Sequence, residues 1–236
     1  EHDISGNCLN QALLDLNSEQ MVCFDAVLAQ SNQFSNFKCF LLYGITGSGK
    51  TEVYMHLIYQ LLLKKKQVLI LVPEISLTPQ TIKRFKQRFN VKIAVIHSKV
   101  SGNTKTKDWL AARDDQAKII IGTRSAIFTP IQNLGMIIID EEHDASFKQQ
   151  EGFRYNARDL AVIRAQKLNI PILLGSATPS MESVANALNN RYELLTIKNR
   201  AGLANLPQLK LLNTKQKKLC TITVHVFFIN NSRSRS

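Results

Sequence analysis

A glycine-rich loop that contains one lysine is the strongest chemical feature of this sequence. It has the spacing G-x-x-x-x-G-K-[ST], formed by Gly44, Ile45, Thr46, Gly47, Ser48, Gly49, Lys50 and Thr51. Glycines let the backbone curl so that successive N–H groups and a helix N-terminus point at one phosphate. Lys50 would then reach the β- and γ-phosphates of a nucleotide, and the Thr51 hydroxyl would ligate Mg²⁺. The alternative is a chance glycine-rich turn, but an apolar run before the loop and a helical pattern after it favour a phosphate loop.

A run of carboxylates is the second candidate site. Asp140, Glu141 and Glu142 directly follow the apolar residues 136–139, and His143 comes next. Asp140 is the candidate Mg²⁺ partner, and Glu141 is the candidate base that orients or activates a water molecule. Adjacent carboxylates repel one another, so a bound cation would compensate them. A solvated acidic turn is the alternative, and His143 taken alone is more often a hydrogen-bonding residue than a catalyst.

The elements that would position these residues alternate along the chain. Apolar runs predict strands at residues 38–43, 67–72, 92–97, 118–122, 136–140, 170–175 and 192–197. Helical spacing predicts helices at residues 18–30, 50–63, 76–89, 104–113, 156–167 and 180–188. Strands that are apolar on both faces are typical of a parallel sheet covered by helices. We therefore expect an open α/β sheet with the acids at the carboxyl end of a strand, where ligands bind in such folds.

Length and composition limit the class of protein. The chain has 236 residues, and 44% of them are hydrophobic, which suits one or two globular domains. No apolar run approaches the ~20 residues that would cross a bilayer, and the N-terminus lacks a basic leader with an apolar run after it. We expect a cytoplasmic protein without a membrane partner. The four cysteines form no C-x-x-C pair that would preset a zinc site.

The charge is large but uneven. The chain carries 30 basic and 18 acidic residues, a net charge of +12, which suits a polyanionic partner such as nucleic acid. Residues 1–40 have a net charge of −4, residues 41–197 of +8, and residues 198–236 of +8. The last part includes the Ser/Arg end, which has the weakest relation to the α/β pattern. The hypothesis of DNA binding therefore depends on motifs rather than on net charge.

Several motifs in this order resemble those of a known family. GITGSGKT, DEEH and GSATP are together similar to superfamily 2 helicases of the DEAD/DEAH type. VPEISLTPQ at residues 72–80, GTRSAIF at 122–128, the stretch at 140–165 and GSATPSMES at 175–183 resemble the PriA-type replication-restart helicases more closely. The resemblance runs from about residue 16 to about residue 206. It implies a RecA-like P-loop NTPase lobe, an open and mostly parallel sheet with helices on both faces, with ATP and Mg²⁺ as cofactors.

The resemblance also implies an organisation and a function. Residues 1–15 would be an N-terminal segment, 16–200 the first RecA-like helicase lobe, and 201–236 a truncated linker with an irregular tail. The lobe would bind Mg-ATP and single-stranded or forked DNA, and ATP hydrolysis would drive 3′-to-5′ unwinding in the full-length family. Primosome proteins and single-strand-binding proteins would be partners. The family's second lobe and zinc cluster have no counterpart, so we expect a fragment that hydrolyses ATP slowly and does not unwind DNA alone.

The same resemblance assigns roles to individual residues. Gln20 would read adenine, although capping of a helix with Asn17 is an alternative and both can hold. Lys50 and Thr51 match the nucleotide-binding pair, and Asp140 and Glu141 match the magnesium and hydrolysis pair. The residues that would contact DNA or couple its binding to hydrolysis are Thr123, Arg124, Phe147, Lys148, Phe153, Arg154, Tyr155, Arg158, Ser176, Ala177 and Thr178.

The segment at residues 147–158 combines aromatic rings with cations. Bases stack on such rings, at ~1–3 kcal/mol per base, while cations follow the phosphates. Packing in the core is the alternative for each ring by itself, but the segment as a unit favours DNA sensing.

Three other functions stay open. One is another superfamily 2 DNA translocase, and one is a non-catalytic ATP-binding remnant. A transporter ATPase or GTPase is the third, but the sequence contains no LSGGQ or N-K-x-D motif.

Overall fold

A seven-stranded parallel sheet forms the centre of the protein. The computed structural model describes residues 8–33, 37–98 and 102–201. The strand order is β3-β4-β2-β5-β8-β1-β9, and every neighbouring pair is parallel. The strands are β1 (Cys39–Gly44), β2 (Gln67–Leu71), β3 (Ile93–Ile96), β4 (Ile119–Gly122), β5 (Leu134–Asp140), β8 (Ile172–Ser176) and β9 (Glu193–Ile197). The open, parallel sheet that the alternating pattern predicts is therefore confirmed.

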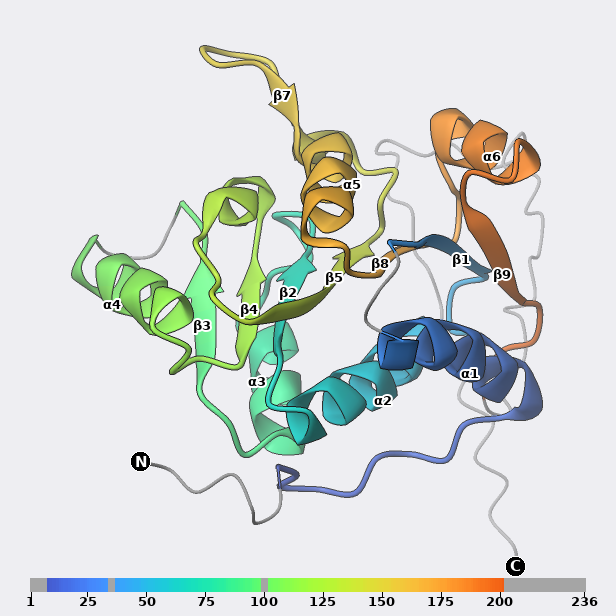
Figure 1. The fold of residues 1–236 in the computed structure, drawn as a ribbon, viewed down its shortest axis with the longest axis horizontal. Helices are drawn as coiled ribbons and strands as arrows, with labels where there is room; N and C mark the ends of the chain where they lie inside the picture. The colour runs from blue at the N-terminus through green and yellow to red at the C-terminus, as the bar shows by residue number, and fades with distance from the viewer. Residues whose placement is uncertain (1–7, 34–36, 99–101, 202–236) are drawn as a thin grey trace, which may run out of the picture. The chain divides into compact units, whose positions relative to one another are not determined.

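Helices cover both faces of this sheet (Figure 1). They are α1 (Ser18–Gln33), α2 (Lys50–Leu63), α3 (Pro79–Arg88), α4 (Gly102–Arg113), α5 (Ala157–Leu168) and α6 (Met181–Leu188). Apolar side chains of α1, α2 and α3 form one core with alternate strand residues, and those of α4 and α5 form a second core with the others. Each residue of β2 and β4 is buried, as expected for strands with a helical layer on each side.

The predicted elements agree with the observed ones to within a few residues. The largest shifts are in α1, which ends at Gln33 rather than near residue 30, and in α3, which begins at Pro79 rather than near residue 76. Thr78 is its N-cap, since its side chain accepts a hydrogen bond from the N–H of Thr81, and a proline at the first helical position fits a helix start.

Three short elements have no counterpart in the sequence pattern. They are the 3₁₀ turns η1 (Arg124–Phe128) and η2 (Ala145–Phe147), and a hairpin of β6 (Lys148–Gln149) and β7 (Tyr155–Asn156). The loop that leads into β7 projects away from the sheet beyond α5 (Figure 1). We call residues 148–156 the hairpin.

The segment before α1 packs against the body of the sheet. Cys8 is buried in the core that α1, α2 and α3 share. The Cys8 carbonyl accepts a hydrogen bond from the N–H of Asn90, and the N–H of Asn10 donates to the Arg88 carbonyl. The proposed segment at residues 1–15 therefore shares, from residue 8 on, one core with the lobe. The tail predicted at 201–236 lies, after residue 201, outside the described residues. Among the helices of the described ranges, none has the length and apolar character of a bilayer span.

Candidate functional site

Parallel pairing brings three predicted motifs to the same edge of the sheet. In the register between β1 and β8, Tyr43 lies opposite Ser176, so the glycine-rich loop starts beside the S-A-T motif. In the register between β5 and β8, Asp140 lies opposite Gly175. The loop, the acids and the S-A-T residues therefore lie side by side at the carboxyl ends of β1, β5 and β8, where open α/β sheets bind ligands.

The glycine-rich loop connects β1 to α2 in a conformation that requires glycine. Gly47 and Gly49 have φ angles of 80° and 84°, in the left-handed region that other residues avoid. A Cβ atom on Gly49 would also lie 2.2 Å from the Gln20 amide nitrogen. The loop therefore has the backbone path and the helix N-terminus that a phosphate site needs.

Lys50 and Ser48 lie inside the loop. The Lys50 side chain is buried, and its Nζ atom donates to the Gly44 carbonyl at 2.8 Å. The Ser48 hydroxyl is buried and has no hydrogen-bond partner among the described residues. An unpaired buried hydroxyl is costly unless a ligand completes it. The cation and the unpaired hydroxyl therefore fit an anionic group, while Thr46 and Gly47 are exposed and Ile45 and Thr51 are partly buried.

Gln20 links α1 to this loop. Its N–H donates to the Asn17 side chain and its Oε1 atom accepts from the Asn17 N–H, both at 2.9 Å, so the predicted helix cap is present. Its Nε2 atom donates to the Ser48 carbonyl at 2.8 Å. Both ends of the buried amide are thus held within the protein, and the reading of adenine stays a prediction.

The acidic run begins at the end of β5. Burial and the neighbouring charge of Glu141 raise the pKa of Asp140, while the Tyr54 hydrogen bond and the Lys50 charge oppose this change. The Tyr54 hydroxyl, on α2, donates to Asp140 Oδ1 at 3.1 Å. Glu141 is half-buried and has a φ angle of 48°, a strained conformation for a residue with a side chain. Such strain is typical of functional turns.

The oxygen donors at this edge fit Mg²⁺. A carboxylate and a hydroxyl, from Asp140 and Thr51, are the hard ligands that this ion prefers, and Mg²⁺ usually takes its other positions from phosphates and water. Within the ranges that the structure describes, no group of three His, Cys, Asp or Glu side chains could hold a metal by itself. The donor set therefore fits a cation that arrives together with a nucleotide.

His143 joins the acidic run to the S-A-T motif. Its Nδ1 atom lies 2.7 Å from the Ser176 hydroxyl, and its Nε2 atom lies 3.2 Å from the Thr178 hydroxyl. The Ser176 hydroxyl also accepts from the Thr178 N–H at 3.0 Å. Ser176 is buried, Ala177 is partly buried and Thr178 is exposed. The two motifs therefore form one hydrogen-bonded unit.

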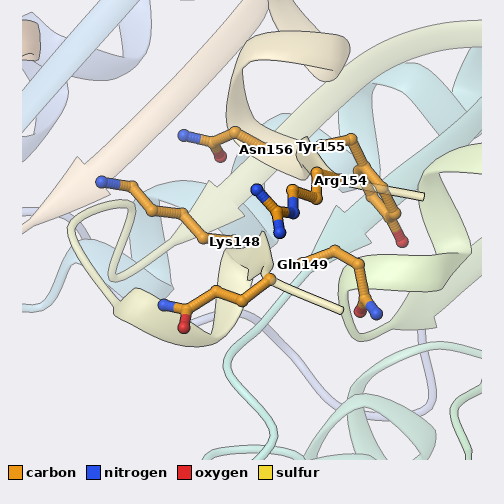
Figure 2. Close-up of a pocket in the computed structure, with 6 residues that line it drawn as sticks. Lys148, Gln149, Arg154, Tyr155 and Asn156 are labelled. Carbon is orange, nitrogen blue, oxygen red and sulfur yellow. The ribbon is translucent and has the colours of Figure 1, made fainter. Parts of the chain in front are cut away.

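The hairpin forms a second, open site. Its residues line a pocket of about 590 Å³, made by Lys148, Gln149, Gln150, Arg154, Tyr155 and Asn156. Figure 2 shows the Arg154 guanidinium in the middle of this pocket, with Lys148 to one side of it and Tyr155 to the other. The Tyr155 ring contacts two exposed rings, with centroids 5.0 Å from Phe128 and 5.9 Å from Phe153. Cations and accessible rings thus share one surface.

Two predicted DNA contacts in the segment at residues 147–158 are buried instead. Phe147 is only 1% exposed and packs in the core beneath α5, so its ring is not available for stacking on a base. Core packing, the alternative for each ring, describes Phe147 but not Phe153, which is 76% exposed. Arg158 is also buried, and its Nη1 atom lies 3.1 Å from a carboxylate oxygen of Glu142.

Thr123 and Arg124 support the hairpin from η1. The Thr123 side chain is buried, and Arg124 donates to the carbonyls of Ser146 and Lys148 at 3.1 and 2.9 Å. Arg124 therefore binds the backbone at the base of the hairpin. A contact of either residue with DNA stays a prediction.

Sequence reasoning missed three residues of these sites. Tyr54 looked like one more apolar position of α2, and Phe128 like the end of a turn, so neither gave a signal. Glu142 stood in the acidic run but received no role, although a third acid after a buried strand invited the question of its partner.

Comparisons with known proteins agree with this geometry. A model of the DEAD/DEAH box helicase family matches residues 17–187. The chain is 54% identical to the replication restart protein PriA of Haemophilus influenzae, over 80% of this chain and 25% of that protein. It is 45% identical to PriA of Bacillus subtilis, over 86% of this chain and 25% of that protein. The chain thus spans about a quarter of the length of these curated relatives.

A solved structure of RecG bound to a three-way DNA junction has the same fold. Its TM-score is 0.58 with 23% sequence identity, and the match covers 79% of this chain and 24% of that one. At this identity the match shows the fold alone, and it confirms the predicted RecA-like P-loop lobe. The family match, the motif order and the geometry of the sheet edge agree, and the chain belongs to the DEAD/DEAH box helicase family.

Proposed function

We propose that this chain binds Mg-ATP at the edge formed by β1, β5 and β8, and single-stranded or forked DNA on the hairpin. One observation carries the proposal: the register of β8 with β1 and β5 puts the phosphate loop, Asp140 and Ser176 side by side. A lysine, a magnesium-binding acid and a coupling motif are what phosphoryl chemistry requires in such an NTPase.

Each loop residue has a task in nucleotide binding. Lys50 would leave the Gly44 carbonyl and donate to the phosphates, and the Ser48 hydroxyl would gain its missing partner. Thr51 and Asp140 would hold Mg²⁺, which neutralises charge on the β- and γ-phosphate oxygens when it is bound. Glu141 would accept a hydrogen bond from the attacking water and orient it. Gln20 would meet the adenine only after its hydrogen bond to the loop opens.

The hairpin supplies the contacts that DNA needs. Lys148 and Arg154 would follow the phosphates, and the exposed rings of Phe153 and Phe128, with the partly buried ring of Tyr155 between them, would stack on bases. Phe147 and Arg158 act from inside the protein, by fixing the base of the hairpin and the start of α5. This division follows from burial, since only exposed rings can reach a base.

The wider activity is proposed from the relatives. The curated relatives are named replication restart proteins, and the RecG structure was solved with a DNA junction. We propose that the chain serves a 3′-to-5′ DNA helicase of replication restart in the cytoplasm, with primosome and single-strand-binding proteins as partners. Because an arginine supplied from another domain or protein can stabilise the transition state in such NTPases, we expect slow hydrolysis by the lobe at residues 16–200 taken by itself.

Nucleotide binding tests the proposal. A fluorescent ADP analogue with Mg²⁺ should bind the purified chain, and single-stranded DNA should bind with an affinity that falls as salt rises. Binding without measurable hydrolysis would favour the non-catalytic alternative. Absence of nucleotide binding in a folded chain would contradict the proposal.

A further inference from the structure

A buried carboxylate lies between the hydrolytic acids and the hairpin. The side chain of Glu142, next to Glu141, is 0% exposed. Its Oε1 atom accepts from the Ser180 N–H at 2.7 Å. Its Oε2 atom accepts from the hydroxyls of Ser180 and Ser183, at 3.1 and 2.9 Å, and from Arg158 Nη1 at 3.1 Å. One carboxylate therefore satisfies four donors.

These donors come from the starts of two helices, α5 and α6. Ser180 is the N-cap of α6, directly after the S-A-T motif, and Ser183 is in the first turn of that helix. Arg158 is in the first turn of α5, two residues after the hairpin ends at Asn156. The Glu142 N–H also donates to the Gly175 carbonyl at 3.0 Å, which fixes its backbone to β8. Glu142 thus joins β5, α5 and α6 at one point.

Burial makes this junction rigid. Arg158 is only 9% exposed at its side chain, and it also pairs with Asp159 at 3.0 Å. Glu142 would therefore be left buried without a charge partner if Arg158 moved away. A broken buried ion pair is much more costly than an exposed one. Glu142 lies between Glu141 and His143 in the chain. A movement of the hydrolytic acids would therefore move Glu142, and with it the first turns of α5 and α6. Contiguous networks of this kind can carry coupling between two sites.

We infer that Glu142 is a positioning residue that couples nucleotide binding at the sheet edge to DNA binding on the hairpin, through Arg158 and the serines of α6. The inference rests on the proposed function and adds a residue that carries its coupling. It also gives the buried Arg158 a role that differs from direct contact with phosphate. Glu142 itself touches neither ligand.

The test measures single-stranded DNA affinity of the full chain by fluorescence anisotropy, with and without saturating Mg²⁺ and a non-hydrolysable ATP analogue. For the wild type we expect the two affinities to differ by about fivefold or more, the lower range of allosteric coupling. In Glu142→Gln an amide nitrogen replaces one acceptor oxygen and the buried ion pair with Arg158 is lost, while Arg158 keeps its pair with Asp159. We expect the ratio of the DNA affinities with and without the nucleotide analogue to fall to within about twofold of one. Nucleotide affinity measured without DNA should change by less than about threefold.

Glu182→Gln is the matched control. Glu182 is also on α6 and lies 4.0 Å from Arg158, but its side chain is 62% exposed, so it should keep the wild-type ratio. If Glu142→Gln does not fold, Ser183→Ala decides, because it removes one of the four donors to Glu142 and no charge. The inference is supported if the ratio of DNA affinities in Ser183→Ala is at least about twofold closer to one than the wild-type ratio.

Four results would overturn the inference. A folded Glu142→Gln variant with the wild-type ratio contradicts the inference alone, and so does an unchanged ratio in Ser183→Ala when that variant is the only one that folds. Wild-type protein that binds both ligands without any coupling also contradicts it. Wild-type protein that binds neither ligand contradicts the proposed function, and the inference falls with it.

Discussion

The edge of the sheet and the hairpin place functional side chains in opposite ways. At the edge, Lys50, Asp140 and Ser176 each have a hydrogen-bond partner in the protein, and the strands that carry Asp140 and Ser176 are paired on both sides. On the hairpin, Phe153 and Arg154 are exposed, and the loop between β6 and β7 makes few hydrogen bonds with the rest of the described chain. Chemistry is thus assigned to the rigid part and recognition to the exposed part.

This difference separates two kinds of constraint. A side chain that must meet a phosphate within a few tenths of an ångström gains from a fixed backbone. A surface that must accept any base gains from accessible rings and cations on a short loop, because stacking tolerates all sequences. The same aromatic residue type therefore has different tasks at positions only six residues apart.

Phe147 and Phe153 give the largest expected contrast. Phe147→Ala should lower the free energy of unfolding by about 3–5 kcal/mol, because it removes a buried ring from the core beneath α5. Phe153→Ala should leave stability within about 0.5 kcal/mol and weaken single-stranded DNA binding by ~1–3 kcal/mol. Urea denaturation and fluorescence anisotropy measure the two effects. Equal loss of stability in both variants would remove the distinction between the regions.

Lys50 and the hairpin cations should show opposite losses. Lys50→Ala should weaken nucleotide binding by about 10- to 100-fold, since a charge-assisted hydrogen bond contributes about 1.5–3 kcal/mol, and leave DNA affinity without nucleotide unchanged. Lys148→Ala combined with Arg154→Ala should spare nucleotide binding. Because each contacted phosphate contributes ≈ 0.7 to the slope for single strands, the salt dependence should fall by about 1.4.

Unchanged nucleotide affinity in Lys50→Ala would refute the phosphate loop. An unchanged salt dependence in the hairpin double variant would place the DNA elsewhere. Each variant is the control for the other, because both remove lysine charge from folded protein.

Gly175 and Tyr54 test how tightly the sheet edge is packed. A Cβ atom on Gly175 would lie 1.7 Å from the Tyr54 hydroxyl and 2.9 Å from the ring carbon that carries it. Gly175→Ala should therefore destabilise the protein by about 1–3 kcal/mol. Adding Tyr54→Phe removes the closest clash, so the double variant should lose less than the sum of the single variants. Thermal denaturation measures these losses of stability. If the loss in the double variant equals the sum of the losses in the single variants, a side chain at position 175 does not contact Tyr54.

Asp140→Asn should give a small change in stability, and in the stabilising direction. Burial raises the pKa of Asp140, so the folded state holds its proton more tightly than the unfolded state and the charged form destabilises the fold. The wild type therefore loses stability as pH rises above the unfolded pKa, and the asparagine variant does not. At neutral pH we expect the variant to be more stable by roughly 1 kcal/mol, with the difference vanishing in acid.

The same variant should lose the Mg²⁺ dependence of nucleotide binding. Lower stability of Asp140→Asn at neutral pH would contradict the account of the buried acid. Retained Mg²⁺ dependence would contradict its assignment as the metal partner.

Local patterns predicted the fold well, and they placed the glycine-rich loop and the acids at strand ends, where the structure has them. The glycine-rich loop must follow a strand and precede a helix, and the doubly apolar strands 67–72 and 136–140 fit only a parallel sheet. These are short-range constraints, so the sequence displays them. The order of the strands, which places β8 between β1 and β5, depends on tertiary packing and could not be obtained in this way.

The remaining features of the site depend on burial, which a motif does not report. Phe147 and Phe153 have the same residue type in the same segment, and only tertiary structure separates a core ring from an exposed one. Tyr54 reaches Asp140 because Gly175 leaves room, a relation between three distant parts of the chain. Glu142 looked like one more acid until its four donors were in place.

Amide NMR of the chain during stepwise addition of ligands tests the central claim most directly. Mg²⁺ with a non-hydrolysable ATP analogue should shift the signals of residues 44–51 and 140–143 first. Single-stranded DNA should then shift the signals of residues 148–156. The account predicts these two separate sets, with changes at Glu142 and Arg158 in both titrations. DNA-induced shifts confined to other surfaces, or a nucleotide titration that leaves residues 44–51 unchanged, would contradict it.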